Sequence, residues 1–410
     1  MTDLATLAGR FGTPTYVYDL ADLRRAVRDL GAVLPAPSRV YFSVKANPHP
    51  DVCRTVAAAG LRAEIASSGE IAPALAGGFA AADVLMTGPG KTPDDVDAAL
   101  AAGLTRFSVD SPVDLALVGR LAQEHAVDAQ CLLRVNADAA VPGMGLSMTG
   151  TASPFGADAS WVLAQPERFR GSGRARIRGL HLYMGTNITD EEVLATQFST
   201  SITLAAQLRC ALDVPMQEVD LGGGFGMPYA RAGSRPDFSG LAARITGDLD
   251  ALLPGWRRAD PEVTFESGRH LAGGCGTLIS RVVDVKVSKG RTFVVLDTGI
   301  HHLGGMSGLR RVPRIVPDLI TPDRPGDPVH DCSVVGPLCT PLDTWSSGVT
   351  LPPLEPGDVV GVPNVGAYGL TAGLLAFLGH PPALEVVVDG ADVVSVSRLD
   401  LVRSSVVLPV

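Results

Sequence analysis

The chain has 410 residues, 46% of them hydrophobic and 19% charged, so it can bury a large core and exceeds the size of one average domain. Its formal net charge of −9 argues against nucleic acid or an anionic membrane surface as the main partner. No apolar run reaches the roughly 18 residues of a membrane span and the N-terminus lacks a signal-peptide pattern, so we expect a cytoplasmic globular protein with no membrane partner.

Short apolar runs alternate with amphipathic segments along the first two thirds of the chain, which is the pattern of repeated βα units. Eight runs in parallel alternation predict a (β/α)8 TIM barrel, whose functional loops follow the carboxyl ends of the strands. The predicted strands are 40–44, 62–66, 84–87, 106–109, 130–135, 177–184, 218–221 and 262–265, and predicted helices between them include 51–59, 68–76, 93–102 and 112–125.

The pattern of hydrophobic and polar residues changes after about residue 271. The stretch TLISRVVDVKVSKGRTFVVLDTG alternates as antiparallel strands do, with Lys289–Gly290 as its turn. Further strands are expected at 358–361 and 384–388, and the early run PTYVYDL is expected to pair with them. We therefore predict a barrel at residues 30–270 and a discontinuous antiparallel β-domain made of residues 1–29 and 271–410.

The six cysteines are scattered, without a CxxC pair, at positions 53, 131, 210, 275, 332 and 339. Scattered cysteines fit reduced thiols better than a disulfide framework or a zinc site. The pattern therefore predicts no bound metal.

Three motifs place reactive groups at the carboxyl ends of predicted strands. In VYFSVKAN, Lys45 ends a run suited to a buried strand, although a lone lysine there more often only reaches solvent. In DLGGGFG, the glycines 222–224 would let backbone N–H groups approach a phosphate, although glycine runs are often only turns. In FESGR, Glu266 and Arg269 follow the eighth strand.

Together these groups suit one cofactor, pyridoxal 5′-phosphate. A lysine can bind the aldehyde as a Schiff base, the glycine amides and Arg269 can hold the phosphate, and Glu266 can hold the pyridine nitrogen protonated. Each motif is ambiguous alone, and their combination is much less so.

At this point the sequence resembles the fold-type III pyridoxal-phosphate-dependent decarboxylases, the family of ornithine, arginine and diaminopimelate decarboxylases. The resemblance covers nearly the whole chain and rests on the motifs YFSVKANP, EIASSGEI, GLHLYMGTN, DLGGGFG, ESGRHL, GPLCTPLDTW and VGAYG, in the family's order. It implies an alanine-racemase-like barrel with a C-terminal β-domain. It also implies a head-to-tail homodimer whose two active sites are shared between subunits.

The resemblance implies roles for individual residues. Lys45 matches the Schiff-base lysine, and Cys339 matches a thiol that protonates the substrate carbon after CO2 has left, in the partner's site. The positions that match cofactor-binding residues are Glu64, where the family usually has aspartate, Arg134, His181, Tyr183, Thr186, Gly222, Gly223, Gly224, Glu266, Arg269 and Tyr368.

Some positions depart from the family pattern. Tyr183 stands where the family stacks a histidine on the pyridine ring, and His181 lies two residues earlier on the same strand face. ESGR replaces the usual EPGR, and SPFG replaces SKFG. Thr340 follows the thiol where enzymes acting on free diamino acids have an acid that holds the distal ammonium. Asp343 could replace that acid only by moving.

The segment at 301–314 is basic instead, with Arg310, Arg311 and Arg314 where the family builds its substrate loop. Arginines there could meet a carboxylate or a phosphopantetheine phosphate. The stretch GMGLSMTGTASPFG and the exchange of histidine for Tyr183 resemble the branch that decarboxylates amino acids tethered to an acyl carrier protein in natural-product biosynthesis.

We therefore expect a decarboxylase that acts through a Lys45 aldimine, with a carrier-bound acidic amino acid as substrate and the acyl carrier protein as partner. A diaminopimelate or other free diamino-acid decarboxylase is the alternative. A racemase on the same fold and a non-catalytic carrier of the cofactor are further alternatives. The carrier is disfavoured because such proteins resemble the barrel alone.

Overall fold

The computed structural model describes residues 3–138, 146–147, 152–303 and 315–405. The chain forms two compact units. One unit contains residues 1–22, 228–233 and 273–410, and the other contains residues 23–227 and 234–272. The division into domains at residues 29/30 and 270/271 stays a prediction. Among the described residues, no helix combines the length and the apolar character that a bilayer crossing needs.

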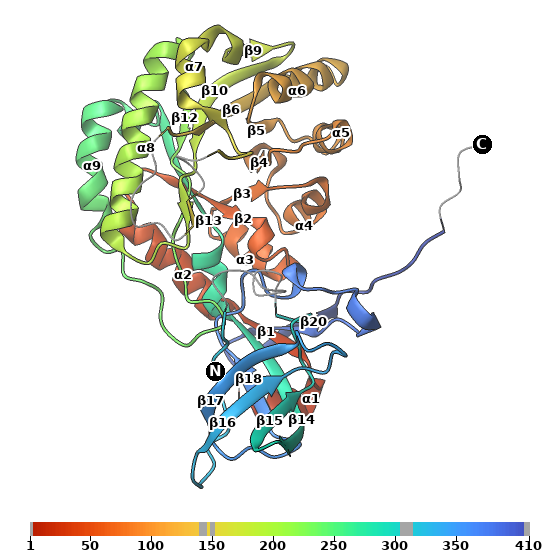
Figure 1. The fold of residues 1–410 in the computed structure, drawn as a ribbon. Coiled ribbons are helices and arrows are strands. Elements are labelled where there is room, and N and C mark those ends of the chain that lie inside the picture. Colours follow the sequence, from red (N-terminus) through yellow and green to blue (C-terminus); the bar gives the residue numbers. More distant parts are fainter. Residues whose placement is uncertain (1–2, 139–145, 148–151, 304–314, 406–410) are drawn as a thin grey trace. The chain divides into compact units, whose positions relative to one another are not determined.

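The larger unit contains a closed barrel of eight parallel strands with helices along its outer side (Figure 1). Closure comes from pairing between the fifth and sixth barrel strands, β6 and β10, in addition to the continuous strand order. This confirms the predicted TIM barrel. The barrel strands are β2 (Arg39–Ser43), β3 (Arg62–Ile65), β4 (Val84–Met86), β5 (Arg106–Val109), β6 (Ala129–Asn136), β10 (Ala175–Leu182), β12 (Glu218–Asp220) and β13 (Glu262–Ser267).

Helix starts follow local capping chemistry. Proline occupies the first turn of α3, α5 and α6, where its missing N–H costs nothing. The Thr92 side chain accepts from Asp95 N and the Ser111 side chain accepts from Asp114 N. The helices are α2 (Leu20–Val33), whose first turn belongs to the smaller unit, α3 (Pro50–Ala58), α4 (Ile71–Ala76), α5 (Pro93–Ala101), α6 (Pro112–Glu124), α7 (Ala159–Ala164), α8 (Glu191–Leu212), α9 (Leu241–Leu252) and α10 (Arg269–Ala272).

The predicted helix at 68–76 is divided in the structure. Residues Ser68–Glu70 form a 3-10 turn and the α-helix starts only at Ile71. The Glu70 carboxylate accepts the Ala66 N–H at 2.6 Å, so it caps the turn rather than extending a helix. Short pairs flank the barrel: β8 (Ala157–Asp158) adds to β6, β9 (Gly171–Ser172) adds to β10, and β7 (Leu146–Ser147) pairs with β11 (Gly185–Thr186).

The barrel interior is layered along the strand direction. Glu218 lies at the amino-terminal end, where it accepts from Tyr41 Oη at 2.9 Å and Thr264 Oγ1 at 3.1 Å and pairs with Arg106. A cavity of about 90 Å³ opens beside these groups and is lined by Arg106, Gln130, Leu132, Arg178, Gln217, Glu218 and Glu262. Above it, Tyr41, Leu85 and Leu132 form a buried cluster that closes the interior.

The smaller unit is built on an eight-stranded, mostly antiparallel sheet with the order β17-β16-β15-β14-β1-β19-β20, in which β18 also pairs with β14. The β14–β15 hairpin turns at Lys289–Gly290 as predicted, with Gly290 at φ +82°. Two pairings, β1–β19 and β15–β16, are parallel. The strands are β1 (Thr15–Asp19), β14 (Gly276–Ser288), β15 (Arg291–Leu296), β16 (Val329–Val335), β17 (Thr344–Leu351), β18 (Val359–Val362), β19 (Leu384–Asp389) and β20 (Asp392–Arg398).

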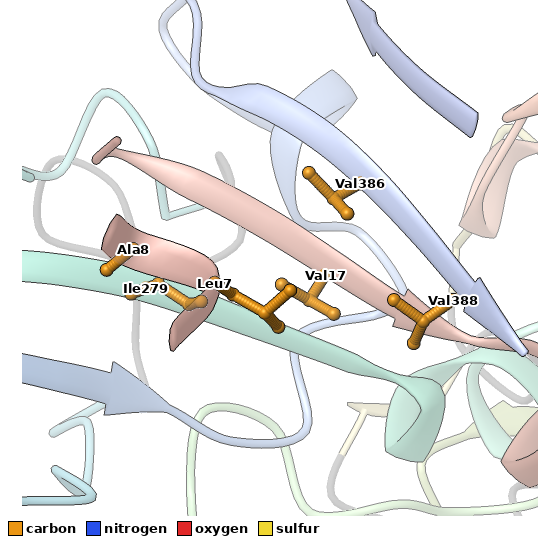
Figure 2. Packing of buried hydrophobic residues seen from close by; sticks show 6 residues of the cluster. All are labelled: Leu7, Ala8, Val17, Ile279, Val386 and Val388. Carbon is orange, nitrogen blue, oxygen red and sulfur yellow. The ribbon is translucent and has the colours of Figure 1, made fainter. Parts of the chain in front are cut away.

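A small apolar core ties the N-terminus to this sheet. Helix α1 (Leu4–Phe11) packs on it with Leu7 and Ala8, as Figure 2 shows. The remaining members of the cluster are Val17, Ile279, Val386 and Val388. The run PTYVYDL, which is distant in sequence from its neighbours, pairs with β14 and β19 of this sheet, and its pairing into the β-domain was predicted.

Candidate active site

A polar layer lies at the carboxyl end of the barrel. Because side chains alternate along a strand, the residue two positions beyond each interior residue also faces inward, closer to the carboxyl end. Leu132 is followed in this way by Arg134, and His181 lies opposite both Arg134 and Asp220 in the strand register. The layer contains Ser43, Glu64, Thr87, Ser108, Arg134, His181, Asp220 and Glu266, all of them buried.

Lys45 lies in a 3-10 turn (Val44–Ala46) directly after β2, at the end of the first barrel strand, as predicted. Its Nζ donates to both oxygens of Glu64, at 2.8 and 3.0 Å, and Thr87 Oγ1 donates to Oε1 at 2.5 Å. Burial alone would raise the pKa of Glu64, but the Lys45 ammonium and these hydrogen bonds outweigh it and lower the pKa to about 2. Glu64 is thus a fixed anion that orients the amine.

The chain has only four lysines, at positions 45, 91, 286 and 289. Lys91 is buried, and its ammonium is committed to Gly88 O at 2.6 Å, Ser108 O at 2.7 Å and Asp114 Oδ2 at 2.8 Å. The other two lie at the exposed β14–β15 hairpin of the smaller unit. Lys45 is therefore the barrel lysine whose amine lies at the polar layer.

The glycine run follows β12 and has no room for side chains. A Cβ at Gly222, whose φ is +74°, would lie 2.4 Å from Leu182 O, and one at Gly223 would lie 2.5 Å from Glu266 O. Gly224 has φ +106°. The backbone can therefore take this conformation only with glycine, which suits close approach of N–H groups to an anion.

Glu266 lies on β13 at the base of the polar layer. Its Oε1 is buried without a hydrogen-bond partner among the described residues, and His181 Nε2 is 3.2 Å away. Asp220 Oδ1 accepts the Gly222 N–H at 2.8 Å. Burial, with Glu266 and Glu218 nearby, raises the pKa of Asp220 well above its usual value.

The remaining predicted barrel residues surround this layer. The Arg134 guanidinium lies 5.7 Å from the centre of the Tyr183 ring and 4.7 Å from that of Phe155. Thr186 lies on β11 and Arg269 begins α10, both half-buried. The two-residue strand period could have identified Ser108, Thr87 and Asp220 as members of the layer, although no motif singled them out.

The other predicted site residues belong to the smaller unit. Cys339 is exposed and Thr340 is half-buried. Tyr368 has φ +55°, and its carbonyl accepts from Tyr229 Oη at 3.0 Å. The Asp343 oxygens accept from Ile300 N and Leu338 N, both at 2.8 Å. Arg310, Arg311 and Arg314 lie outside the described residues.

The barrel residues fit pyridoxal phosphate on two observations. The Glu266 carboxylate is paired with no lysine or arginine among the described residues, and His181 Nε2 lies near its Oε1, so Oε2 can receive a ring N–H. The glycine run takes a backbone conformation that excludes side chains, as a loop that approaches a phosphate with its N–H groups requires. Lys45, Glu266 and the run at 222–224 would therefore hold the aldehyde, ring and phosphate ends of the cofactor.

Residues 20–273 match the family model described as the pyridoxal-dependent decarboxylase, pyridoxal binding domain. The chain is 29% identical to an L-glutamyl-[BtrI acyl-carrier protein] decarboxylase from Niallia circulans, over 94% of this chain and 90% of that protein. It is 32% identical to a diaminopimelate decarboxylase from Actinosynnema pretiosum subsp. auranticum, over 93% of this chain and 85% of that protein.

Its fold resembles that of diaminopimelate decarboxylase from Helicobacter pylori in complex with L-lysine, with a TM-score of 0.83 and 24% identity over 97% of this chain and 95% of that one. The family model covers more than half of the chain, and the barrel residues fit the cofactor that the family binds. This chain therefore belongs to the pyridoxal-dependent decarboxylases and is a carboxy-lyase that uses pyridoxal phosphate.

Proposed function

We propose that this enzyme removes the α-carboxylate of an acidic amino acid that is tethered through its side chain to an acyl carrier protein. The observation that carries the proposal is that the Asp343 carboxylate is already hydrogen-bonded to the backbone. Thr340 offers no charge next to the thiol, and both Asp343 oxygens already accept backbone N–H groups. Swinging Asp343 toward a substrate ammonium would break both hydrogen bonds and unfold the turn that they hold.

A free diamino acid carries a second ammonium that needs a buried anion, whereas a side chain bound as a thioester carries none. The similarity to the glutamyl carrier-protein decarboxylase supports the same substrate class. Diaminopimelate decarboxylases are also similar over almost the whole chain, so a free diamino acid is the second candidate.

The chain's own residues divide the work in this proposal. Lys45 binds the cofactor and is oriented by Glu64. The cofactor's phosphate is held by the backbone at 222–224 together with Thr186, Arg269 and Tyr368. Arg134 and Tyr183 support the pyridine ring. Bound pyridoxal phosphate withdraws electrons from the substrate's α-carbon so that the carboxylate can leave as CO2. Glu266 holds the ring nitrogen, and Cys339 supplies the proton that replaces CO2 on the same carbon.

We also propose a cytoplasmic homodimer in which Cys339 serves the partner's barrel. The exposed position of Cys339 on the smaller unit is compatible with reaching a second subunit. The carrier protein would be recognised through its acidic surface or its phosphopantetheine phosphate, by Arg310, Arg311 and Arg314.

One experiment tests the substrate class directly. The cofactor-loaded enzyme is incubated with a panel of free amino acids and of the same amino acids bound to a carrier protein, and the loss of CO2 is followed by mass. Carrier-bound glutamate or a related acid should lose CO2 much faster than any free diamino acid. Efficient turnover of free diaminopimelate would favour the second candidate, and loss of stereochemistry without loss of mass would indicate a racemase.

A further inference from the structure

Three buried polar side chains form a line across the carboxyl end of the barrel. Ser108 on β5 contacts His181 on β10, with Oγ 2.7 Å from Nδ1. His181 Nε2 in turn lies 3.2 Å from Glu266 Oε1 on β13. The exposed fractions of the three residues are 0%, 1% and 3%, so water cannot replace any of these contacts.

The serine end of this line is held in place. The buried Lys91 ammonium donates to the backbone oxygen of Ser108 at 2.7 Å and pairs with Asp114. This ammonium fixes the end of β5 from outside the barrel. The Ser108 hydroxyl therefore meets the imidazole from a rigid strand, as a positioning group requires.

The imidazole can satisfy Glu266 in only one neutral tautomer. In that tautomer the single N-bound ring proton is on Nε2 and points at the Glu266 carboxylate, and Nδ1 accepts the proton of the Ser108 hydroxyl. In the other tautomer, Nε2 and Oε1 would present lone pairs to each other at 3.2 Å in a buried site, which is costly. Neither Nε2 nor Oε1 has a hydrogen-bond partner among the described residues, so each is available to the other.

A second acid, Asp220, lies beside this contact. Asp220 brings an oxygen within 4.8 Å of both the imidazole and Glu266, but its Oδ1 accepts the Gly222 N–H. Burial and the nearby Glu266 carboxylate raise its pKa, which opposes a second negative charge at this point. His181 Nε2 is the ring nitrogen that faces Glu266, 3.2 Å from Oε1.

We propose that Ser108 and His181 are positioning residues for Glu266. The Glu266 carboxylate favours the tautomer with the proton on Nε2, Ser108 holds that ring through Nδ1, and the His181 Nε2–H occupies Oε1 of Glu266, which leaves Oε2 for the cofactor. The carboxylate is thereby held in the orientation in which it can receive the ring nitrogen of the cofactor. This inference rests on the proposed role of Glu266 and concerns no part of the substrate.

The test uses the full-length protein with pyridoxal phosphate labelled with 15N in the ring. The ring-nitrogen chemical shift reports its protonation, and titration of the apoprotein gives the cofactor affinity. His181→Gln keeps an N–H donor that reaches Glu266, whereas His181→Asn is too short to reach it. Ser108→Ala removes the hydroxyl that holds the imidazole at Nδ1. Ser201→Ala is the matched control, because Ser201 on α8 is equally buried and its hydroxyl has no partner among the described residues.

We expect Ser108→Ala and His181→Asn to weaken cofactor binding about tenfold and to move the shift toward that of an unprotonated ring nitrogen. His181→Gln and Ser201→Ala should stay close to the unsubstituted protein. Thermal unfolding of each apoprotein checks that the barrel still forms. Ser108→Ala removes a single oxygen atom, so it remains informative if a His181 variant fails to fold.

Glu266→Gln distinguishes the role of Glu266 itself from the positioning role of Ser108 and His181. If it changes the shift while Ser108→Ala and His181→Asn leave both shift and affinity unchanged, the positioning role is wrong and the role of Glu266 stands. If Glu266→Gln also leaves the shift unchanged, Glu266 does not hold the ring nitrogen and the inference is overturned with it. An equal effect of Ser201→Ala would likewise overturn it.

Discussion

Lys45 and Glu64 form a two-pronged ion pair, with the lysine Nζ 2.8 and 3.0 Å from the two carboxylate oxygens. The lysine side chain is 43% exposed while the glutamate side chain is 2% exposed. The amine is therefore accessible to a ligand and at the same time held by a buried anion.

We predict that Lys45 carries the cofactor. Borohydride reduction of the loaded enzyme should leave the cofactor covalently bound to the peptide that contains Lys45, because this amine faces the polar layer. Peptide mass mapping measures it. With only four lysines to distinguish, an adduct on position 91, 286 or 289 would refute the assignment.

Removing the cation alone should destabilise the apoprotein. Lys45→Met leaves the Glu64 carboxylate buried without its ammonium, which should lower the free energy of unfolding by about 2 kcal/mol, less than for a fully buried pair because water screens the exposed lysine. Urea unfolding at neutral pH measures it. The double variant Lys45→Met/Glu64→Gln should recover most of the loss, and equal stability of the single and double variants would contradict the prediction.

Cys339 should act in the partner's active site. Cys339→Ala should still bind the cofactor but turn over slowly or release misprotonated product, because only the later proton donor is missing. Mixing inactive Lys45→Ala with inactive Cys339→Ala should restore activity in a fraction of the dimers. Subunit exchange is verified with differently tagged chains, and exchange without recovered activity would exclude a shared site.

Turnover of a carrier-bound substrate should depend on charge. Attraction between the arginines at 310 and 311 and an acidic carrier is screened by salt, so kcat/KM should fall as salt rises and when either arginine becomes glutamine. Arg120→Gln is the control, because Arg120 is an exposed arginine on α6. Ornithine, lysine and diaminopimelate should be poorer substrates by about a hundredfold or more, since their distal ammonium would be unpaired. Equal turnover of free diaminopimelate would refute this.

The stability of the smaller unit should depend on pH through Glu385. Burial raises the pKa of this carboxyl from 4.5 to about 7, against the opposing hydrogen bond that Tyr18 donates at 3.1 Å. A raised pKa means that the contribution is complete below pH 4.5 and is lost as the pH rises through 7. Glu385→Gln keeps an acceptor for Tyr18 and should gain up to about 3 kcal/mol relative to the unsubstituted protein between pH 4.5 and pH 8. A difference in unfolding temperature between Glu385→Gln and the unsubstituted protein that does not change with pH would contradict this prediction.

Local patterns in the sequence were enough to predict the barrel strands to within about two residues, and also the hairpin at Lys289–Gly290. Strands β16, β17 and β20 were not predicted, because their outward faces are partly exposed and break the apolar alternation. The helix at 68–76 was overextended because the local hydrogen bond from the Ala66 N–H to the Glu70 carboxylate depends on a side-chain conformation that the apolar pattern does not record.

The sequence predicted individual residues of the candidate site from their motifs, but it did not predict the contacts between these residues. Lys45, Glu266 and the glycine run could be found because each ends a strand or breaks a local rule. The contact between Ser108 and His181 joins residues 73 positions apart through two different strands. Such contacts depend on how strands shift against one another when the barrel closes, and no single segment records that shift.

The cluster of Tyr41, Leu85 and Leu132 lies between two polar regions inside one barrel, one at each end of the strands. Leu132 also lines the cavity of about 90 Å³ at the opposite end, so this side chain is part of the wall between that cavity and the polar layer. Shortening Leu132 to alanine would enlarge this cavity toward the polar layer, and water entering there would weaken the electrostatic contacts of that layer. Leu132 thus separates the cavity from the polar layer. Redesign of the enzyme for longer ligands should therefore change the loops at the carboxyl end of the barrel and keep this residue.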